Sequence, residues 1–253
     1  MARTAIPGGL SARRAWRSAT LADRRPETAQ AVTLVLDVPD WPGHVPGQHV
    51  DVRLTSEDGY RATRSYSVAA PTDGDALELT VQRVPDGEVS TFLCDDLRRG
   101  DTVEVRGPLG GWFVWRPGQP GPVLLVAGGS GVVPLMSMLR ARPAGSASPF
   151  RLVYSARSPE DLLYREELAR RAAENDGVEV GLVFTRSAPE GDRRGVGRLR
   201  PEDLTGHGWS VDDAPTCYVC GPTGFVESAA AHLVALGHPP ERIRTERFGP
   251  SGP

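Results

Sequence analysis

The residues best suited to chemistry in this sequence are Arg64, Tyr66 and Ser67, in the run Arg64-Ser65-Tyr66-Ser67. Side chains two positions apart on a β-strand point to the same face, so the arginine can hold a phosphate while the tyrosine lays its ring on a flat cofactor. We therefore expect Tyr66 to cover one face of an isoalloxazine ring, Arg64 to pair with a pyrophosphate and Ser67 to hydrogen-bond near the flavin N5. Taken alone, such a run is more often an ordinary exposed strand, so the interpretation depends on the motifs that follow.

A second motif, Gly87-Glu88-Val89-Ser90, is typical of a phosphate-binding turn. Glycine lets a ligand approach the backbone closely, and the N–H groups that follow lie at a helix start, where they face an anion. Arg83 would complete this phosphate site. The predicted flavin contacts in this region are Val81, Arg83, Gly87, Val89, Ser90 and Thr91.

The third motif, the segment 128–134, follows the apolar run 123–127 and precedes a segment expected to be helical. A glycine-rich loop in this strand–turn–helix setting binds a nucleotide phosphate. The motif departs from the G-x-G-x-x-G fingerprint because Pro134 stands where the third glycine would be, and a turn kept only for tight packing is the alternative. The predicted nucleotide contacts here are Gly128, Gly129, Ser130, Gly131 and Pro134.

Two arginines, Arg157 and Arg186, each follow the end of an apolar strand. Together with Ser155 they could hold a 2′-phosphate, which would select NADPH over NADH. The alternative is a pair of solvated surface arginines.

The spacing Cys217-Tyr218-Val219-Cys220 invites a metal or redox-disulfide interpretation, which we reject. A tetrahedral site needs about four ligands, and residues three apart on a strand point to opposite faces. Cys217 is expected to be a buried apolar residue. Cys220 stands at a strand's carboxyl end just before Gly221 and Pro222, where parallel sheets place their ligands. The five histidines show no ligand spacing, and no metal site is predicted.

Composition bounds the class of protein. The chain has 253 residues, of which 39% are hydrophobic. Its formal net charge is -3, so the protein as a whole has no positive electrostatic field that would attract nucleic acid. All 29 positive residues are arginine. Three cysteines are too few for a disulfide framework and favour a reducing compartment, so the expected location is the cytoplasm. No apolar run approaches the length of a membrane span, and no membrane association is expected.

The chain is predicted to have two domains that meet at the proline- and glycine-rich linker 116–122. Residues 15–117 show short alternating strands at 31–38, 48–54, 64–69, 77–83 and 102–107, typical of an antiparallel β-barrel or sandwich, and a short helix at 90–97 with Ser90 and Thr91 as cap candidates. Residues 122–249 alternate apolar strands (123–127, 150–154, 178–185, 216–220, 242–245) with helices (133–141, 159–173, 224–236), typical of a parallel α/β sheet.

Taken together, these motifs resemble the ferredoxin–NADP reductase superfamily, and the match covers residues 15 to 249. The resemblance implies a Greek-key flavin-binding barrel followed by an NAD(P)-binding α/β domain, with FAD as cofactor. It places Cys220 and Glu246 beside the nicotinamide ring, where with Ser67 they would flank the hydride path, and Phe248 near the flavin. It also implies that the cofactor-binding residues include Gly221 and Pro222. Many oxygenase reductases of this family carry a fused iron–sulfur domain with a four-cysteine loop, which this chain lacks.

The resulting hypothesis is a flavin-dependent oxidoreductase that takes a hydride from NAD(P)H, with NADPH favoured, onto FAD N5. It would pass single electrons to a separate partner such as a ferredoxin, a Rieske protein or a haem or molybdenum enzyme. The alternatives are a reductase of a small acceptor, such as a ferric chelate, a quinone or free flavin, and a flavin-binding electron-transfer subunit of a larger complex. A monomer is expected. An arginine patch near the start could suit an acidic ferredoxin, its alternative being a solvated tail: Arg13, Arg14, Arg17, Arg24 and Arg25.

Overall fold

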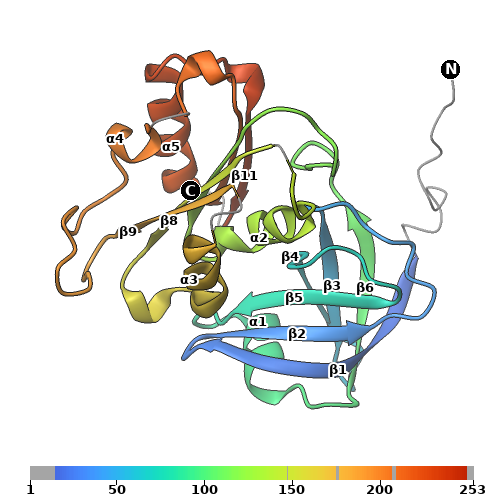
Figure 1. The fold of residues 1–253 in the computed structure, drawn as a ribbon. Helices are drawn as coiled ribbons and strands as arrows, with labels where there is room; N and C mark the ends of the chain where they lie inside the picture. Colours follow the sequence, from blue (N-terminus) through green and yellow to red (C-terminus); the bar gives the residue numbers. More distant parts are fainter. Residues whose placement is uncertain (1–14, 147, 175–176, 207–208, 250–253) are drawn as a thin grey trace, which may run out of the picture. The chain divides into compact units, whose positions relative to one another are not determined.

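The computed structural model describes residues 15–146, 148–174, 177–206 and 209–249 (Figure 1). The chain divides between Trp115 and Arg116 into two compact units. Each unit contains one sheet, and each is treated separately below.

The first unit is an antiparallel sheet of six strands. They are β1 (Trp16–Thr28), β2 (Ala31–Asp37), β3 (His49–Thr55), β4 (Arg61–Ser67), β5 (Ala76–Gln82) and β6 (Thr102–Leu109). The strand order is β4-β3-β6-β1-β2-β5, and an antiparallel bridge between Val68 and Leu79 closes β4 onto β5. Because β6 returns to lie beside β3 after the consecutive strands β3, β4 and β5, the connection is a Greek key. The predicted antiparallel Greek-key barrel is confirmed.

The core of this unit comes from alternate positions along its strands, as expected for strands with one face inward. Leu34 and Leu36 of β2, Val50 and Val52 of β3, and Leu79 of β5 are fully or almost fully buried. A short helical segment lies between β5 and β6. It consists of α1 (Glu88–Thr91), which continues directly as a π-helical turn, η1 (Phe92–Asp96).

The second unit is a parallel five-stranded sheet with helices on both faces (Figure 1). Its order is β11-β10-β7-β8-β9. The chain therefore adds β8 and β9 on one side of β7 and then β10 and β11 on the other side. The strands are β7 (Val123–Gly128), β8 (Phe150–Ala156), β9 (Val178–Phe184), β10 (Thr216–Pro222) and β11 (Ile243–Phe248). The helices are α2 (Val132–Ala141), α3 (Arg165–Ala173), α4 (Pro201–Leu204) and α5 (Thr223–Ala235), with 3₁₀ turns at Gly129–Gly131, Pro159–Asp161, Val211–Asp213 and Pro240–Arg242. The predicted parallel α/β architecture is confirmed.

Several element boundaries differ from the prediction. The helix expected over 159–173 is split into the 3₁₀ turn Pro159–Asp161 and α3. The residues between them, Leu162, Leu163 and Tyr164, are buried, and Tyr164 has a left-handed backbone, φ 57°, which interrupts the helix just before α3 starts. The helix expected from Ser90 starts instead at Glu88 with Gly87 as its N-cap. The longest strand, β1, was not among the predicted segments, because its polar run 22–27 breaks the apolar alternation.

Candidate functional site

The strand β4 places Arg64 and Tyr66 on one face, as predicted. Their cross-strand neighbours on β3 are Val52 and Val50, both fully buried. Tyr66 is half-buried and packs against the barrel core, and this burial raises the pKa of its phenol, which therefore stays protonated at neutral pH. Arg64 is exposed, and its Nη1 donates a hydrogen bond to the carbonyl oxygen of Thr63 at 2.7 Å. Among the described residues it forms no ion pair, so its charge is available to an anion.

The opposite face of β4 is tied into the barrel by Asp51. Ser65 Oγ donates to Asp51 Oδ1 at 2.6 Å, and Arg106 Nη2 donates to Asp51 Oδ2 at 2.6 Å. Burial acts to raise the pKa of Asp51, but these hydrogen bonds and the Arg106 charge outweigh it, so that the pKa lies below its ordinary value. The Arg106 guanidinium lies 4.7 Å from the ring centre of Trp16. Sequence reasoning missed Asp51, whose partner Arg106 lies far along the chain.

The turn at Gly87 is closed by its own residues. Ser90 Oγ accepts a hydrogen bond from the Val84 N–H and donates one to the Gly87 carbonyl oxygen, both at 3.1 Å. The interpretation of Ser90 as an N-cap is therefore wrong, because the helix has already begun at Glu88 and the hydroxyl bonds back to the turn. The first-turn N–H groups of such a segment have no partner within the helix. They remain the groups suited to a phosphate.

The other predicted flavin contacts around this turn are Val81, Val89 and Thr91, and they are buried or half-buried. The side chains of Val81 and Val89 are buried in the core, so they can reach a cofactor only through their backbone atoms. Thr91 is half-buried at the end of α1.

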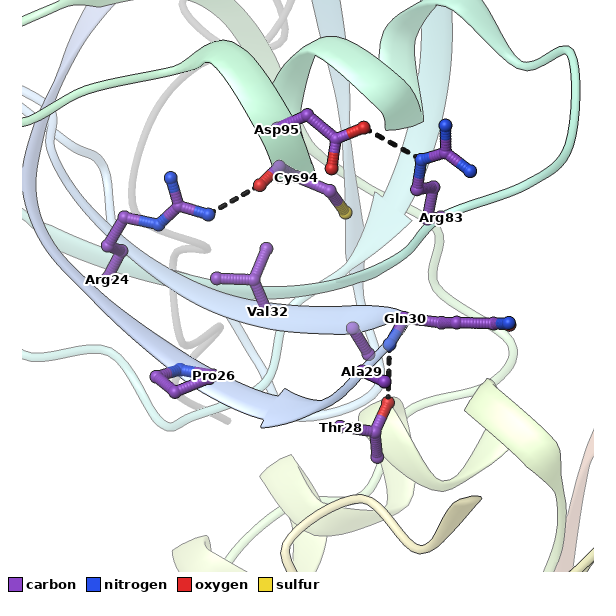
Figure 2. Close-up of a pocket in the computed structure, with 10 residues that line it drawn as sticks. Arg24, Pro26, Thr28, Ala29, Gln30, Val32, Arg83, Cys94 and Asp95 are labelled. Atoms are coloured by element: carbon purple, nitrogen blue, oxygen red, sulfur yellow. Dashed lines mark hydrogen bonds and ion pairs between the residues drawn. The ribbon is translucent and has the colours of Figure 1, made fainter. Parts of the chain in front are cut away.

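Arg83 is held in an ion pair near the predicted phosphate turn. Its Nε lies 2.8 Å from Asp95 Oδ2, and Asp95 is in the last turn of the helical segment that begins beside Gly87. This ion pair forms one wall of a cavity of about 350 Å³, which Figure 2 shows between the β1–β2 hairpin and η1. Cys94 and Arg24 form another part of the wall, where Arg24 donates to the Cys94 carbonyl oxygen.

In the second unit, the glycines of the loop after β7 have different roles. A Cβ atom on Gly131 would lie 2.1 Å from the Cys220 carbonyl oxygen, and one on Gly128 would lie 2.6 Å from the Phe225 ring. Gly129 has φ +54°, and a Cβ atom there would meet nothing within 4 Å. Gly128 and Gly131 are thus required by packing, whereas Gly129 leaves a bare backbone surface next to Ser130 at the start of α2. Sequence reasoning missed Phe225, whose only signal was its place just after Gly221-Pro222-Thr223-Gly224.

The loop lies at the topological switch point of the sheet, between the carboxyl ends of β7 and β10. Open α/β sheets bind ligands in the crevice at such a point. Cys220 stands next to Ala127 on β7 and next to Glu246 on β11. Burial, together with the negative charge of Glu246, raises the pKa of the Cys220 thiol well above its ordinary value. The thiol is therefore neutral and a weak hydrogen-bond donor, and Cys217 packs separately in the core on the α5 side of the sheet.

The remaining predicted nucleotide contacts follow the carboxyl ends of neighbouring strands. Ser155 is paired with Gly128 in the sheet, and the Arg186 N–H donates to the Arg157 carbonyl oxygen at 2.9 Å. Both arginines are exposed, and neither guanidinium forms an ion pair within the described ranges. Their backbones are adjacent, so the two charges can converge on one anion.

Two further predicted residues, Pro134 and Phe248, lie in different parts of the unit. Pro134 is buried in the first turn of α2, where it packs inside the unit. Phe248 is 37% exposed and stands next to Pro222, because β11 extends three residues beyond the predicted strand end.

The proposed arginine patch near the chain start is not a free surface. Arg24 donates to the carbonyl oxygens of Leu97 and Cys94, and Arg25 pairs with Glu78. Arg17 lies over the Trp41 ring at 6.0 Å. These three belong to β1 rather than to a solvated tail, while Arg13 and Arg14 lie outside the described residues, as does His207.

The residues present fit FAD and a nicotinamide nucleotide. The fit rests on Arg64, which forms no ion pair with the described residues, beside a half-buried tyrosine in one unit, and on the bare backbone at Gly129 in the other. Across the described residues, no helix is long and apolar enough to cross a bilayer. In the same part of the chain, no group of three or more histidine, cysteine, aspartate or glutamate side chains could hold a metal ion.

Comparison with known proteins agrees with this division. Residues 20–114 match an oxidoreductase FAD-binding domain, and residues 125–231 match an oxidoreductase NAD-binding domain. The chain is 36% identical to ferredoxin–NADP reductase B of Sorangium cellulosum, over 80% of this chain and 84% of that protein. It is 31% identical to the ferredoxin–NAD(P)+ reductase component of the naphthalene 1,2-dioxygenase system of Pseudomonas putida, over 82% of this chain but only 61% of that protein.

Among solved structures, the FAD/NAD-binding domain of the nitric oxide dioxygenase of Vibrio cholerae superposes with a TM-score of 0.80 at 26% identity, over 92% of this chain and 99% of that one. A ferredoxin–NADP+ reductase of Neisseria gonorrhoeae with bound FAD and NADP shares the fold, with a TM-score of 0.76 at 21% identity, over 92% of this chain and 98% of that one. Fold and site together define a flavin- and nicotinamide-binding oxidoreductase. The chain belongs to the ferredoxin–NADP reductase superfamily.

Proposed function

We propose that this protein is an NAD(P)H-dependent FAD reductase that supplies electrons to a separate redox protein. The observation that carries the proposal is the neutral, buried Cys220 beside Glu246, at the switch point where the Gly129 backbone is open to a nucleotide. Bound FAD would accept a hydride from the nicotinamide and release the electrons one at a time.

The chain's own residues would bind and orient the two groups. Arg64 and the first-turn N–H groups of α1 hold the flavin pyrophosphate, and the protonated Tyr66 ring lies against the isoalloxazine. Ser67 hydrogen-bonds near N5. Cys220 and Glu246 position the nicotinamide or hold a proton beside it, and the glycine loop holds its phosphates.

We further propose a preference for NADPH over NADH. It is supported by Arg157 and Arg186, which are adjacent and form no ion pair in the part of the chain that the structure describes, and which suit the 2′-phosphate that NADH lacks. Charge-assisted hydrogen bonds to a phosphate are the strong kind, so two arginines would discriminate effectively.

For the acceptor, we propose a ferredoxin. This is supported by relatives whose names couple them to ferredoxin, although the chain spans 61% of the length of the naphthalene dioxygenase reductase components. A glycine betaine monooxygenase reductase subunit of Pseudomonas aeruginosa is also 32% identical, over 82% of this chain and 57% of that protein. The second candidate is a reductase of a small acceptor, which would turn over many times without a protein partner.

The test is anaerobic stopped-flow absorbance of the FAD-loaded protein mixed with NADPH and, separately, with NADH. Fast bleaching of the flavin bands by NADPH is expected, and Ser67→Ala should slow it. Absence of bleaching with either donor would reject the reductase and favour an electron-transfer subunit of a larger complex. Bleaching that is unchanged in Ser67→Ala would remove the role of that hydroxyl alone.

A further inference from the structure

Two hydrophobic side chains near the Gly87 turn, those of Tyr60 and Val84, are exposed rather than packed into the core. Tyr60 is 59% exposed and Val84 is 54% exposed. Tyr60 Oη donates a hydrogen bond to Glu88 Oε2 at 3.2 Å, which joins the β3–β4 hairpin to the first residue of α1. Val84 lies on the other side of the turn, since its carbonyl oxygen accepts from the Gly87 N–H at 3.0 Å and its Cβ would be 3.2 Å from a Cβ on Gly87. Both side chains therefore border the predicted pyrophosphate turn.

Tyr60 is held in place before any ligand arrives. Its carbonyl oxygen accepts from the Ser56 N–H at 2.9 Å, and its own N–H donates to Asp58 Oδ1 at 3.2 Å. Ser56 Oγ also donates to Asp58, and these bonds lower the pKa of Asp58, so the carboxylate that holds the turn stays ionised at neutral pH. A preorganised aromatic loses little conformational entropy when a ring stacks on it.

The order of residues along β4 sets a direction for the cofactor. Ser67 and Tyr66 stand at one end, Arg64 follows, and Tyr60 directly precedes the strand. At about 3.3 Å per residue, Tyr60 lies about 13 Å beyond Arg64 on the side away from Tyr66. In a flavin dinucleotide the adenosine lies beyond the pyrophosphate, on the side away from the isoalloxazine. Tyr60 thus stands where the adenine would fall if Tyr66 and Arg64 have their proposed roles.

We propose that Tyr60, with Val84 on the other side of the Gly87 turn, forms the platform on which the adenine ring of FAD stacks, and so selects FAD over FMN. The inference rests on the proposed placement of the flavin on β4. A tyrosine ring offers an aromatic face to the adenine, and Val84 offers an apolar edge. The Glu88 hydrogen bond fixes the tyrosine ring beside the helix start. FMN has no adenosine and would gain nothing from either side chain.

The experiment compares FAD and FMN binding to the apoprotein of the full chain by flavin fluorescence titration. Tyr60→Ala should weaken FAD binding by about 10- to 100-fold and leave FMN binding within about twofold, since stacking of one base on an aromatic is lost. Tyr60→Phe keeps the ring and removes the Glu88 hydrogen bond, so most of the FAD affinity should remain. Val84→Ala should weaken FAD binding by a smaller factor.

The matched control is Val234→Ala, which removes an equally exposed valine, 50% exposed, from α5 of the other unit. It should change neither affinity, and circular dichroism spectra should match across all variants. Equal loss of FAD and FMN affinity in Tyr60→Ala would overturn the proposal, because it would show a general effect on the barrel. Unchanged FAD affinity in Tyr60→Ala would also overturn it.

Failure of this inference is distinguishable from failure of the proposed function. The rate at which NADPH bleaches the FAD-saturated unmodified protein reports hydride transfer, whereas the FAD and FMN affinities of Tyr60→Ala report the adenine platform. If the FAD-to-FMN preference is independent of Tyr60 while bleaching is fast, only the adenine platform is wrong. If the unmodified FAD-loaded protein is never bleached, the reductase proposal is wrong, whatever the affinities show.

Discussion

The backbone of Gly131 lies directly against Cys220, so that even a methyl group on Gly131 would be 2.1 Å from the Cys220 carbonyl oxygen. The nucleotide loop and the strand that carries the thiol are therefore packed backbone to backbone. This contact fixes Cys220 relative to the loop without any side-chain hydrogen bond.

Gly131→Ala should destabilise the protein far more than Gly129→Ala. Overpacking against immobile backbone costs about 3 kcal/mol or more, because neither the turn that holds Gly131 nor β10 can move without disrupting the packing of the unit. Gly129→Ala meets open space and should cost about 1–2 kcal/mol for its left-handed backbone. Urea unfolding of both variants measures the difference, and equal losses would mean that the loop can separate from β10.

Arg157→Ala and Arg186→Ala should each raise the KM for NADPH by about 10- to 100-fold and leave that for NADH nearly unchanged. The reason is that a hydrogen bond to a charged group is worth about 1.5–3 kcal/mol, and only NADPH carries the 2′-phosphate. Steady-state kinetics with both donors measures the ratio. Arg165→Ala, on α3, is the control, and a parallel loss for both donors would reject the phosphate role.

The thiols should be slow to alkylate at pH 8. Burial raises the pKa of Cys94 to about 11 and that of Cys217 to about 12, and it also raises the pKa of Cys220 well above its ordinary value. As pH rises towards 11, half-exposed Cys94 should react first. Mass spectrometry after timed iodoacetamide treatment identifies the site, and fast labelling of Cys220 at pH 8 would contradict this order.

The same shifts make the stability fall at alkaline pH. A thiol whose folded pKa exceeds its unfolded value contributes its full stability below the unfolded pKa, about 8.5, and loses it as the pH rises through the folded value. The free energy of unfolding should therefore decline from pH 9 to 11.

Asp51→Asn should cost about 1–3 kcal/mol at pH 7, because it removes a charged acceptor shared by Ser65 and Arg106. The folded pKa of Asp51 is lowered, so its contribution is present above the unfolded pKa of about 3.9 and is lost as the pH falls through the folded value. The stability difference between the unmodified protein and the variant should vanish in that acidic range. Glu174→Gln breaks an exposed pair with Arg170 and should cost less than about 0.5 kcal/mol.

Local patterns were enough to predict both sheets and the shared face of Arg64 and Tyr66, because strand alternation and the order of strands and helices depend on neighbouring residues. Local patterns could not predict which residues distant in the chain become hydrogen-bond or ion-pair partners. Arg24 lies near other arginines in the sequence, yet its hydrogen-bond acceptors are Cys94 and Leu97.

The same limit explains the errors within the candidate site. Ser90 carries a capping side chain, but Gly87 starts the helix earlier and the hydroxyl closes the turn instead. The ion pair that Arg83 forms with Asp95 was not foreseen either, because the two residues are brought together by folding, and the role of Arg83 at the phosphate turn stays a prediction. The break before α3 depends on the burial of Tyr164, which no local pattern contains.

The Val68–Leu79 bridge joins β4 to β5 only just beyond the end of β4, so the ladder of the sheet ends at β4 and the strand itself is an edge. A terminal strand offers backbone donors and acceptors to any second chain, and charged side chains are a common protection against such association. Arg61 and Arg64 are both exposed along it. We therefore expect Arg64, which we propose for the pyrophosphate, also to protect this edge of the apoprotein against association, so that an apolar replacement would lower solubility as well as cofactor affinity.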